Sequence, residues 1–135
     1  MGIVLRAKDI MNKDIVSVEE NESVLKAVEI MLSKNIGSVA VRRKGEIAGI
    51  LTERDILSRV LAEKRDLEKT KVGEVMSSPL ITVDADSSLY KISRKMIENN
   101  IRRIFVEENG KIVGLISQRD LVIEIMNAFL SLLAI

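Results

Sequence analysis

The stretch Gly49-Ile50-Leu51-Thr52-Glu53-Arg54-Asp55 returns 65 positions later (114 − 49) as Gly114-Leu115-Ile116-Ser117-Gln118-Arg119-Asp120. The same offset aligns Met11 with Met76 and holds without a gap along the flanking sequence. A repeat array of the solenoid type needs at least three copies. The sequence therefore predicts one supersecondary unit that has been duplicated once.

The order of hydrophobic patterns is the same in both copies. Ile15–Val18 is a short apolar run with β-branched residues, which is typical of a buried strand. The segment that follows has apolar residues at helical spacing. Two further strands, Ser38–Arg43 and Glu46–Leu51, flank Lys44-Gly45, and their counterparts flank Asn109-Gly110, a strong hairpin signal. A second helix is expected from Glu53 onward.

This order predicts an α+β fold of two β-α-β-β-α units, each led by a short helical turn. We place the first unit at residues 7–64, a charged linker at 65–71 and the second unit at 72–130. A unit of about 60 residues buries little apolar surface by itself. We therefore expect the two units to pack sheet to sheet about a pseudo-two-fold axis, with paired sites in the cleft between them.

Composition excludes several classes of function. The chain has 135 residues, a net charge of +1, no His and no Cys. It therefore has no thiol nucleophile, no disulfide and neither of the two side chains commonest in zinc sites. The small net charge disfavours nucleic acid as a partner. The apolar stretch Leu121–Ile135 is interrupted by Glu124 and is shorter than a membrane span, so we expect a soluble, cytoplasmic, non-catalytic protein without a metal.

The repeated motif Gly-x-x-[Ser/Thr]-x-Arg-Asp has two interpretations. Thr52 with Asp55, and Ser117 with Asp120, have the spacing of a helix capping box, which is a purely structural role. The same groups also suit a nucleotide, because a hydroxyl and amides at a helix start attract phosphate and a carboxylate can accept both hydroxyls of ribose. Gly within both strands suggests that something approaches the backbone closely.

The chain resembles a tandem pair of cystathionine-β-synthase (CBS) domains, a Bateman module, over roughly residues 7 to 126. Such modules bind adenosine derivatives such as AMP, ADP, ATP or S-adenosylmethionine between their repeats, and they need no other cofactor. The resemblance implies that Asp55 and Asp120 hold ribose, and that Thr52 and Ser117 contact phosphate. It also implies that four apolar residues lie against adenine: Met11 with Val16, and Met76 with Ile81.

The two copies differ at one pair of positions. Arg102 and Arg103 stand where the first copy has Gly37 and Ser38. They are either solvated residues at a strand start or, as the family resemblance implies, phosphate ligands for the nucleotide held by Asp55. Arginine suits phosphate because its guanidinium donates two parallel hydrogen bonds. On that interpretation, the site around Asp55 binds phosphate more tightly than the site around Asp120.

The C-terminal helix is apolar on more than one face, with Phe129 and Leu133 among its residues. Such a surface usually marks a protein interface, and CBS pairs dimerise through helices of this kind. We therefore expect a homodimer that regulates an unidentified effector protein. The alternative function is a dimerisation scaffold without ligand.

Overall fold

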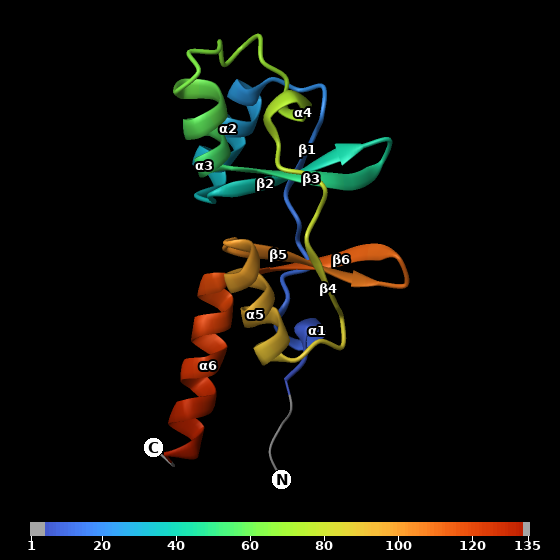
Figure 1. Ribbon diagram of the computed structural model, residues 1–135, viewed down its shortest axis with the longest axis vertical. Coiled ribbons are helices and arrows are strands. Elements are labelled where there is room, and N and C mark those ends of the chain that lie inside the picture. Colours follow the sequence, from blue (N-terminus) through green and yellow to red (C-terminus); the bar gives the residue numbers. More distant parts are fainter. Residues whose placement is uncertain (1–4, 134–135) are drawn as a thin grey trace. The chain divides into compact units, whose positions relative to one another are not determined.

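The computed structural model describes residues 5–133 and contains the two predicted β-α-β-β-α repeats, each led by a helical turn (Figure 1). The mixed α+β class is confirmed. Positions 134–135, the end of the predicted apolar stretch, lie outside the described residues. The first repeat contains α1 (Ala7–Ile10), β1 (Ser17–Glu19), α2 (Val24–Lys34), β2 (Ser38–Arg43), β3 (Glu46–Thr52), α3 (Glu53–Ile56) and the π-helical turn η1 (Leu57–Leu61). The second contains α4 (Val72–Val75), β4 (Thr82–Asp84), α5 (Leu89–Asn99), β5 (Arg103–Glu108), β6 (Lys111–Ser117) and α6 (Gln118–Leu132).

Each repeat forms its own three-stranded sheet. The strand orders are β1-β2-β3 and β4-β5-β6. In both sheets the first pair is parallel, the second pair is antiparallel, and the hairpin has one register shift. The hairpin turns Lys44-Gly45 and Asn109-Gly110 have positive φ at both positions, which matches the right-handed twist of the strands. The predicted hairpins are therefore present in both repeats.

The two 11-residue helices, α2 and α5, begin and end on residues whose side chains suit those positions. The hydroxyl of Ser23 accepts a hydrogen bond from Lys26 N at the start of α2, and Ser88 does the same for α5. Such a cap satisfies an amide that has no partner within the helix. Asn35 and Asn100 end the two helices in the left-handed conformation, with φ of 53° and 51°, which asparagine tolerates better than most residues.

The chain divides into two compact units that do not coincide with the sequence repeats. One unit consists of residues 15–80, and we call it the Asp55 unit. The other consists of residues 5–14 and 81–133, and we call it the Asp120 unit. The leading turn α1 thus lies with the second repeat, where Ala7 N donates to Ser87 O. In the same way α4 lies with the first repeat, where Val72 N donates to Glu22 O.

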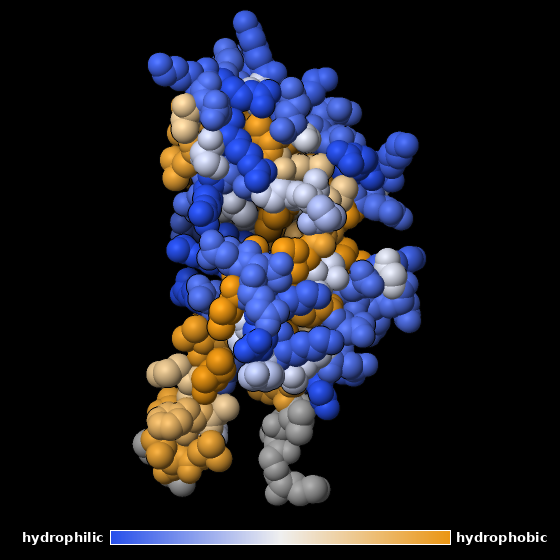
Figure 2. All heavy atoms as spheres, in the orientation of Figure 1, coloured by the Kyte–Doolittle hydropathy of each residue, from blue (hydrophilic) through white to orange (hydrophobic). Residues whose placement is uncertain are grey.

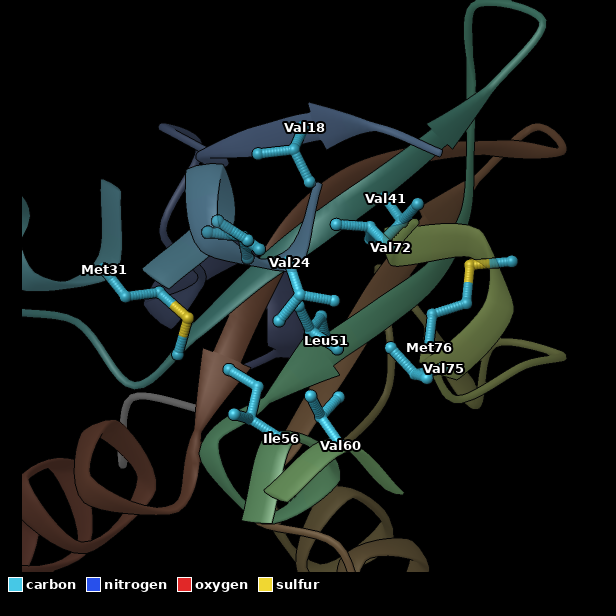
Figure 3. Close-up of a cluster of buried hydrophobic side chains, with 12 residues drawn as sticks. Val18, Val24, Met31, Val41, Leu51, Ile56, Val60, Val72, Val75 and Met76 are labelled. Atoms are coloured by element: carbon cyan, nitrogen blue, oxygen red, sulfur yellow. The ribbon is translucent and has the colours of Figure 1, made fainter. Parts of the chain in front are cut away.

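Each unit has its own hydrophobic core. In the Asp55 unit, Val24 and Leu51 are fully buried and pack with residues from α4 (Figure 3). In the Asp120 unit, Ile92 and Ile116 are fully buried and Ala7 of α1 joins them. Apolar side chains from both parts of the chain therefore hold each exchanged turn in place.

The segment predicted as a linker is part of the Asp55 unit. The carbonyl oxygens of Leu67 and Thr70 accept hydrogen bonds from Leu25 N and Val24 N, the first two amides of α2. Thr70 is only 4% exposed. The linker thus supplies acceptors for amides that the helix itself leaves without partners.

Candidate functional site

The glycines of the repeated motif lie where another segment touches the strand. A Cβ built on Gly49 would lie 2.6 Å from Sδ of Met76 and 2.9 Å from the carbonyl oxygen of Ser77. A Cβ on Gly114 would overlap the side chain of Met11. The close approach expected from the sequence is therefore made by the chain itself. It also places the two predicted adenine-contacting methionines over the strands that carry the motif.

The hydroxyl and carboxylate of each motif form a capping box. Thr52 Oγ1 accepts from Asp55 N at 3.2 Å, and Asp55 Oδ2 accepts from Thr52 N at 3.0 Å. Ser117 and Asp120 repeat this geometry at 3.1 Å and 2.9 Å. The structural interpretation of the motif is correct in both repeats. It uses only one oxygen of each carboxylate, so the second oxygen decides what else each aspartate can bind.

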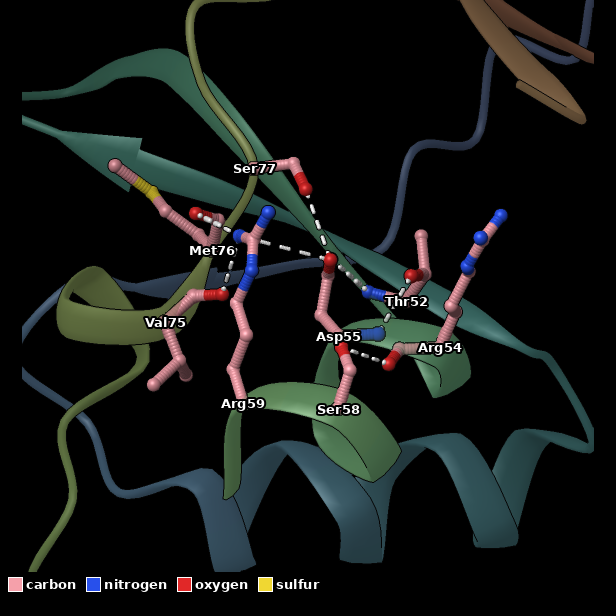
Figure 4. Close-up of polar contacts among 8 residues, drawn as sticks. All are labelled: Thr52, Arg54, Asp55, Ser58, Arg59, Val75, Met76 and Ser77. Carbon is pink, nitrogen blue, oxygen red and sulfur yellow. Dashed lines mark hydrogen bonds and ion pairs between the residues drawn. The ribbon is translucent and has the colours of Figure 1, made fainter. Parts of the chain in front are cut away.

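The second oxygen of Asp55 already has polar neighbours (Figure 4). Ser77 Oγ donates to Asp55 Oδ1 at 2.9 Å, and Arg59 Nη1 lies 3.6 Å from the same oxygen. Asp55 is only 6% exposed. A buried carboxylate requires such partners because the loss of hydration is costly.

Asp120 has a more open surrounding. It is half-buried, and no hydrogen bond or ion pair reaches its Oδ1 from any residue between 5 and 133. The capping bond to Ser117 N uses Oδ2. A carboxylate oxygen beside the start of a 15-residue helix is therefore available to accept hydrogen bonds.

The arginine pair belongs to the Asp120 unit. Arg103 lies directly opposite Ser117 in the β5–β6 pair, and the carbonyl oxygen of Arg102 accepts from Gln118 N at 2.7 Å. Arg102 is exposed and Arg103 is half-buried. The structure thus brings both arginines to the strand end where the Ser117–Asp120 motif starts its helix.

The remaining predicted residues are divided between the units. Val16 is half-buried in the Asp55 unit, whereas its expected partner Met11 lies in the Asp120 unit. Ile81 is half-buried in the Asp120 unit, whereas Met76 lies in the Asp55 unit. Each unit therefore combines one motif aspartate with the methionine of the other sequence repeat.

Sequence reasoning missed Arg59 and Ser77. Both face Asp55, but Ser77 is 22 residues away along the chain, so no local pattern indicates the contact. The sequence does contain a signal that could have drawn attention to Arg59. The 65-residue offset aligns it with Glu124, which carries the opposite charge.

Apolar side chains gather over α6 (Figure 2). Phe129 is 56% exposed and Leu133 is 51% exposed, so the predicted apolar helix is largely uncovered by its own unit. The Asp55 unit has a second apolar surface between α2 and α3, where Leu32 and Leu57 are exposed. No helix among residues 5–133 has the length and apolar character to cross a membrane. The same residues contain no group of three acidic side chains that could hold a metal ion.

Comparisons of the sequence and of the structure with known proteins point to the same family. The family model of the CBS domain matches residues 7–62 and again residues 72–127. The CBS domain-containing protein YhcV of Bacillus subtilis is 33% identical, over 89% of this chain and 85% of its own length. A crystal structure of an uncharacterized conserved protein from Pyrococcus horikoshii has a TM-score of 0.84 at 32% identity, covering 92% of this chain and 94% of that one.

Other similar proteins are longer than this chain or form oligomers. A hexameric CBS-CP12 protein from bloom-forming cyanobacteria has a TM-score of 0.81 at 29% identity, over 90% of this chain and 72% of that one. Homoserine O-acetyltransferase of Methanococcus vannielii is 34% identical over 84% of this chain, but the match spans only 23% of that enzyme. The similarity to the enzyme is therefore confined to its CBS region.

Proposed function

The chain belongs to the CBS-domain family, and from this premise we propose that it is a non-catalytic regulatory module that binds an adenosine derivative. CBS pairs are generally regulatory modules, and relatives with these domains are mostly non-catalytic. The observation that carries the proposal concerns Oδ1 of Asp120. This oxygen has no hydrogen bond or ion pair with any residue between 5 and 133. A carboxylate oxygen of this kind accepts hydrogen bonds from the vicinal hydroxyls of ribose.

The groups around Asp120 suit the other parts of a nucleotide. Arg102 and Arg103 supply positive charge for phosphate at the strand end beside Ser117. Met11, which lies over Gly114, offers an apolar thioether for the face of adenine. The Asp55 unit has the corresponding aspartate, hydroxyl and methionine, with Gly37 and Ser38 in place of the arginines.

Regulation would follow from a shift in population. A ligand that binds one conformation of the chain better than another raises the population of that conformation. An effector protein that recognises the favoured conformation would then sense the concentration of the nucleotide. The module itself needs no catalytic group for this role.

A scaffold without ligand is the second candidate, and the uncovered apolar face of α6 favours it. Exposed apolar surface of this kind usually marks an interface, and one relative of known structure is a hexamer. We propose that α6 pairs two copies of the chain in a homodimer. Dimerisation is compatible with nucleotide binding, so only a ligand assay separates the two candidates.

The test is a thermal-shift screen with AMP, ADP, ATP, S-adenosylmethionine and NAD, followed by calorimetry. A ligand at 100 times its Kd stabilises the folded state by about 2.7 kcal/mol. AMP is then compared with 2′-deoxy-AMP, which lacks one of the two ribose hydroxyls. We expect at least tenfold weaker binding of the deoxy compound. Failure of all five ligands to stabilise the protein would overturn the proposal and favour the scaffold.

A further inference from the structure

The two aspartates of the repeated motif are equivalent in sequence but differ in their surroundings. Asp55 Oδ1 accepts from Ser77 Oγ and lies 3.6 Å from the guanidinium of Arg59. The equivalent oxygen of Asp120 has no partner among residues 5–133. A ribose hydroxyl arriving at Asp55 must therefore compete with groups that are already in place, whereas one arriving at Asp120 meets none.

Arg59 is held in position by a second set of contacts. Its Nη1 atom donates to the carbonyl oxygens of Val75 at 3.0 Å and Met76 at 2.9 Å. These carbonyls lie at the end of α4, where carbonyl oxygens have no partner within the helix and can accept from a cation. The guanidinium therefore cannot leave Asp55 without also giving up the end of α4 (Figure 4).

Ser77 is fixed by its backbone. Its N–H donates to Ile50 O at 2.8 Å, and its carbonyl oxygen accepts from Ile50 N at 3.1 Å. This bridge holds the residue against β3, the strand that leads to Asp55. The Ser77 hydroxyl thus reaches the carboxylate without any rearrangement of the chain.

The Asp120 unit lacks both groups. The 65-residue offset aligns Arg59 with Glu124 and Ser77 with Asn12. Asn12 makes the same backbone bridge, to Leu115. Its side-chain oxygen, however, accepts from Asp14 N at 2.9 Å. Glu124 adds negative charge four residues after Asp120, in the place where the other unit has a positive charge.

We propose that Arg59 and Ser77 form a latch on the diol-binding oxygen of Asp55, so that Asp120 is the aspartate that binds ribose first. Binding at Asp55 then requires displacement of the latch. This inference rests on the proposed nucleotide-binding function and assigns its higher-affinity site. It differs from the expectation drawn from the sequence, which assigned Arg102 and Arg103 to the nucleotide held by Asp55 and so gave that site the tighter phosphate binding. The function proposed above instead assigns both arginines to the nucleotide held by Asp120, because they lie at the strand end beside Ser117.

The test uses calorimetry with AMP on the full chain. The variant D55N leaves the Asp120 site, and D120N leaves the Asp55 site. We expect D55N to keep the wild-type Kd within about threefold and D120N to bind at least ten times more weakly. Adding R59Q to D120N should restore affinity by fivefold or more, because the Asp55 oxygen is then freed from its cation.

Two further variants complete the design. S77A in the D120N background removes only a hydroxyl and should also strengthen AMP binding, which keeps the test valid if R59Q loosens α4. R94Q is the matched control, because Arg94 forms an i,i+4 ion pair with Glu98 on the exposed side of α5. It should leave the affinity of D120N unchanged.

The outcomes separate the two proposals. AMP binding that is lost in D55N and kept in D120N would overturn the latch and leave nucleotide binding intact. Unchanged or weaker binding on adding both R59Q and S77A to D120N would also overturn the latch. If neither the wild type nor any variant binds AMP or the other screened ligands, the proposed function falls, and the latch falls with it.

Discussion

Replacing Gly49 with alanine places a methyl group where the chain already has atoms. The new Cβ would lie 2.6 Å from Sδ of Met76 and 2.9 Å from the carbonyl oxygen of Ser77, well inside the usual contact distance of about 3.5–4 Å. The Met76 thioether can rotate away. The Ser77 carbonyl is held by its hydrogen bond from Ile50 N at 3.1 Å, so relief of the second overlap requires a shift of the backbone.

We expect G49A to lower the free energy of unfolding by about 2 kcal/mol, the middle of the range for overpacked sites. With a urea m-value of about 2 kcal/mol/M, the unfolding midpoint falls by about 1 M. The displacement of Ser77 also moves a hydroxyl that is bonded to Asp55. The same variant therefore weakens the latch described above.

A double-mutant cycle with M76A isolates the steric term. Met76 is 7% exposed, and its truncation by itself costs about 2–5 kcal/mol. In G49A/M76A the new methyl group occupies part of the vacated space, so the double variant should be at least 1 kcal/mol more stable than additivity predicts. G45A is the control. The positive φ of Gly45 makes alanine destabilising there by itself, but its Cβ meets nothing within 4 Å, so the cycle of G45A with M76A should be additive. An unchanged midpoint for G49A, or an additive cycle, would refute the reasoning.

Three other predictions concern charge, assembly and phosphate. The hydrogen bond and charge of Lys8 lower the pKa of Asp86. This carboxylate therefore stabilises the fold above its ordinary pKa of about 3.9 and loses that effect as the pH falls through the lowered value. D86N should flatten the dependence of the urea midpoint on pH below about 4, and an unaltered acid slope would contradict this. Wild-type protein should sediment as a dimer, and the variant F129E/L133E should sediment as a 15.1 kDa monomer. A 15.1 kDa wild-type species at micromolar concentration would contradict the pairing through α6. Hydrogen bonds to charged groups contribute about 1.5–3 kcal/mol each, so R102G/R103S should weaken the binding of AMP at least tenfold, as measured by calorimetry. The binding of adenosine, which has no phosphate, should change little. Equal losses of affinity for both compounds would assign the arginines to the fold.

The local features of the fold could be predicted from the sequence because their causes are local. Asn109-Gly110 accepts positive φ at both positions, and Ser117 with Asp120 has the spacing of a capping box. The hairpin turn and the capping box each depend on residues within one turn of each other. The glycine at position 49 indicated a close approach as part of the nucleotide interpretation, but the atoms that approach it belong to Met76 and Ser77, in a distant segment of the chain.

The exchange of the leading turns could not be predicted in the same way. Ala7 and Val72 are both 0% exposed, and the patterns around them are alike in the two repeats. Either turn would suit either core by its apolar residues alone. The partner is chosen by tertiary packing, which a local pattern does not encode.

The candidate site was predicted only in part for the same reason. The aspartates and hydroxyls follow from their spacing, but Ser77 reaches Asp55 from 22 residues away. The charge reversal between Arg59 and Glu124 is visible in the aligned repeats. The sequence does not indicate, however, that Arg59 also donates hydrogen bonds to the carbonyl oxygens at the end of α4.

The exchanged turns have a consequence for a broken chain. A single cut near position 65 yields two pieces, and each piece holds part of both compact units. The first piece carries α1, which the Asp120 unit requires, and the second carries α4, which the Asp55 unit requires. Each piece therefore lacks part of each core, and the two pieces together supply all of it. The two halves of this protein are therefore mutual complements, and a nicked molecule should hold together as a non-covalent heterodimer of its own fragments.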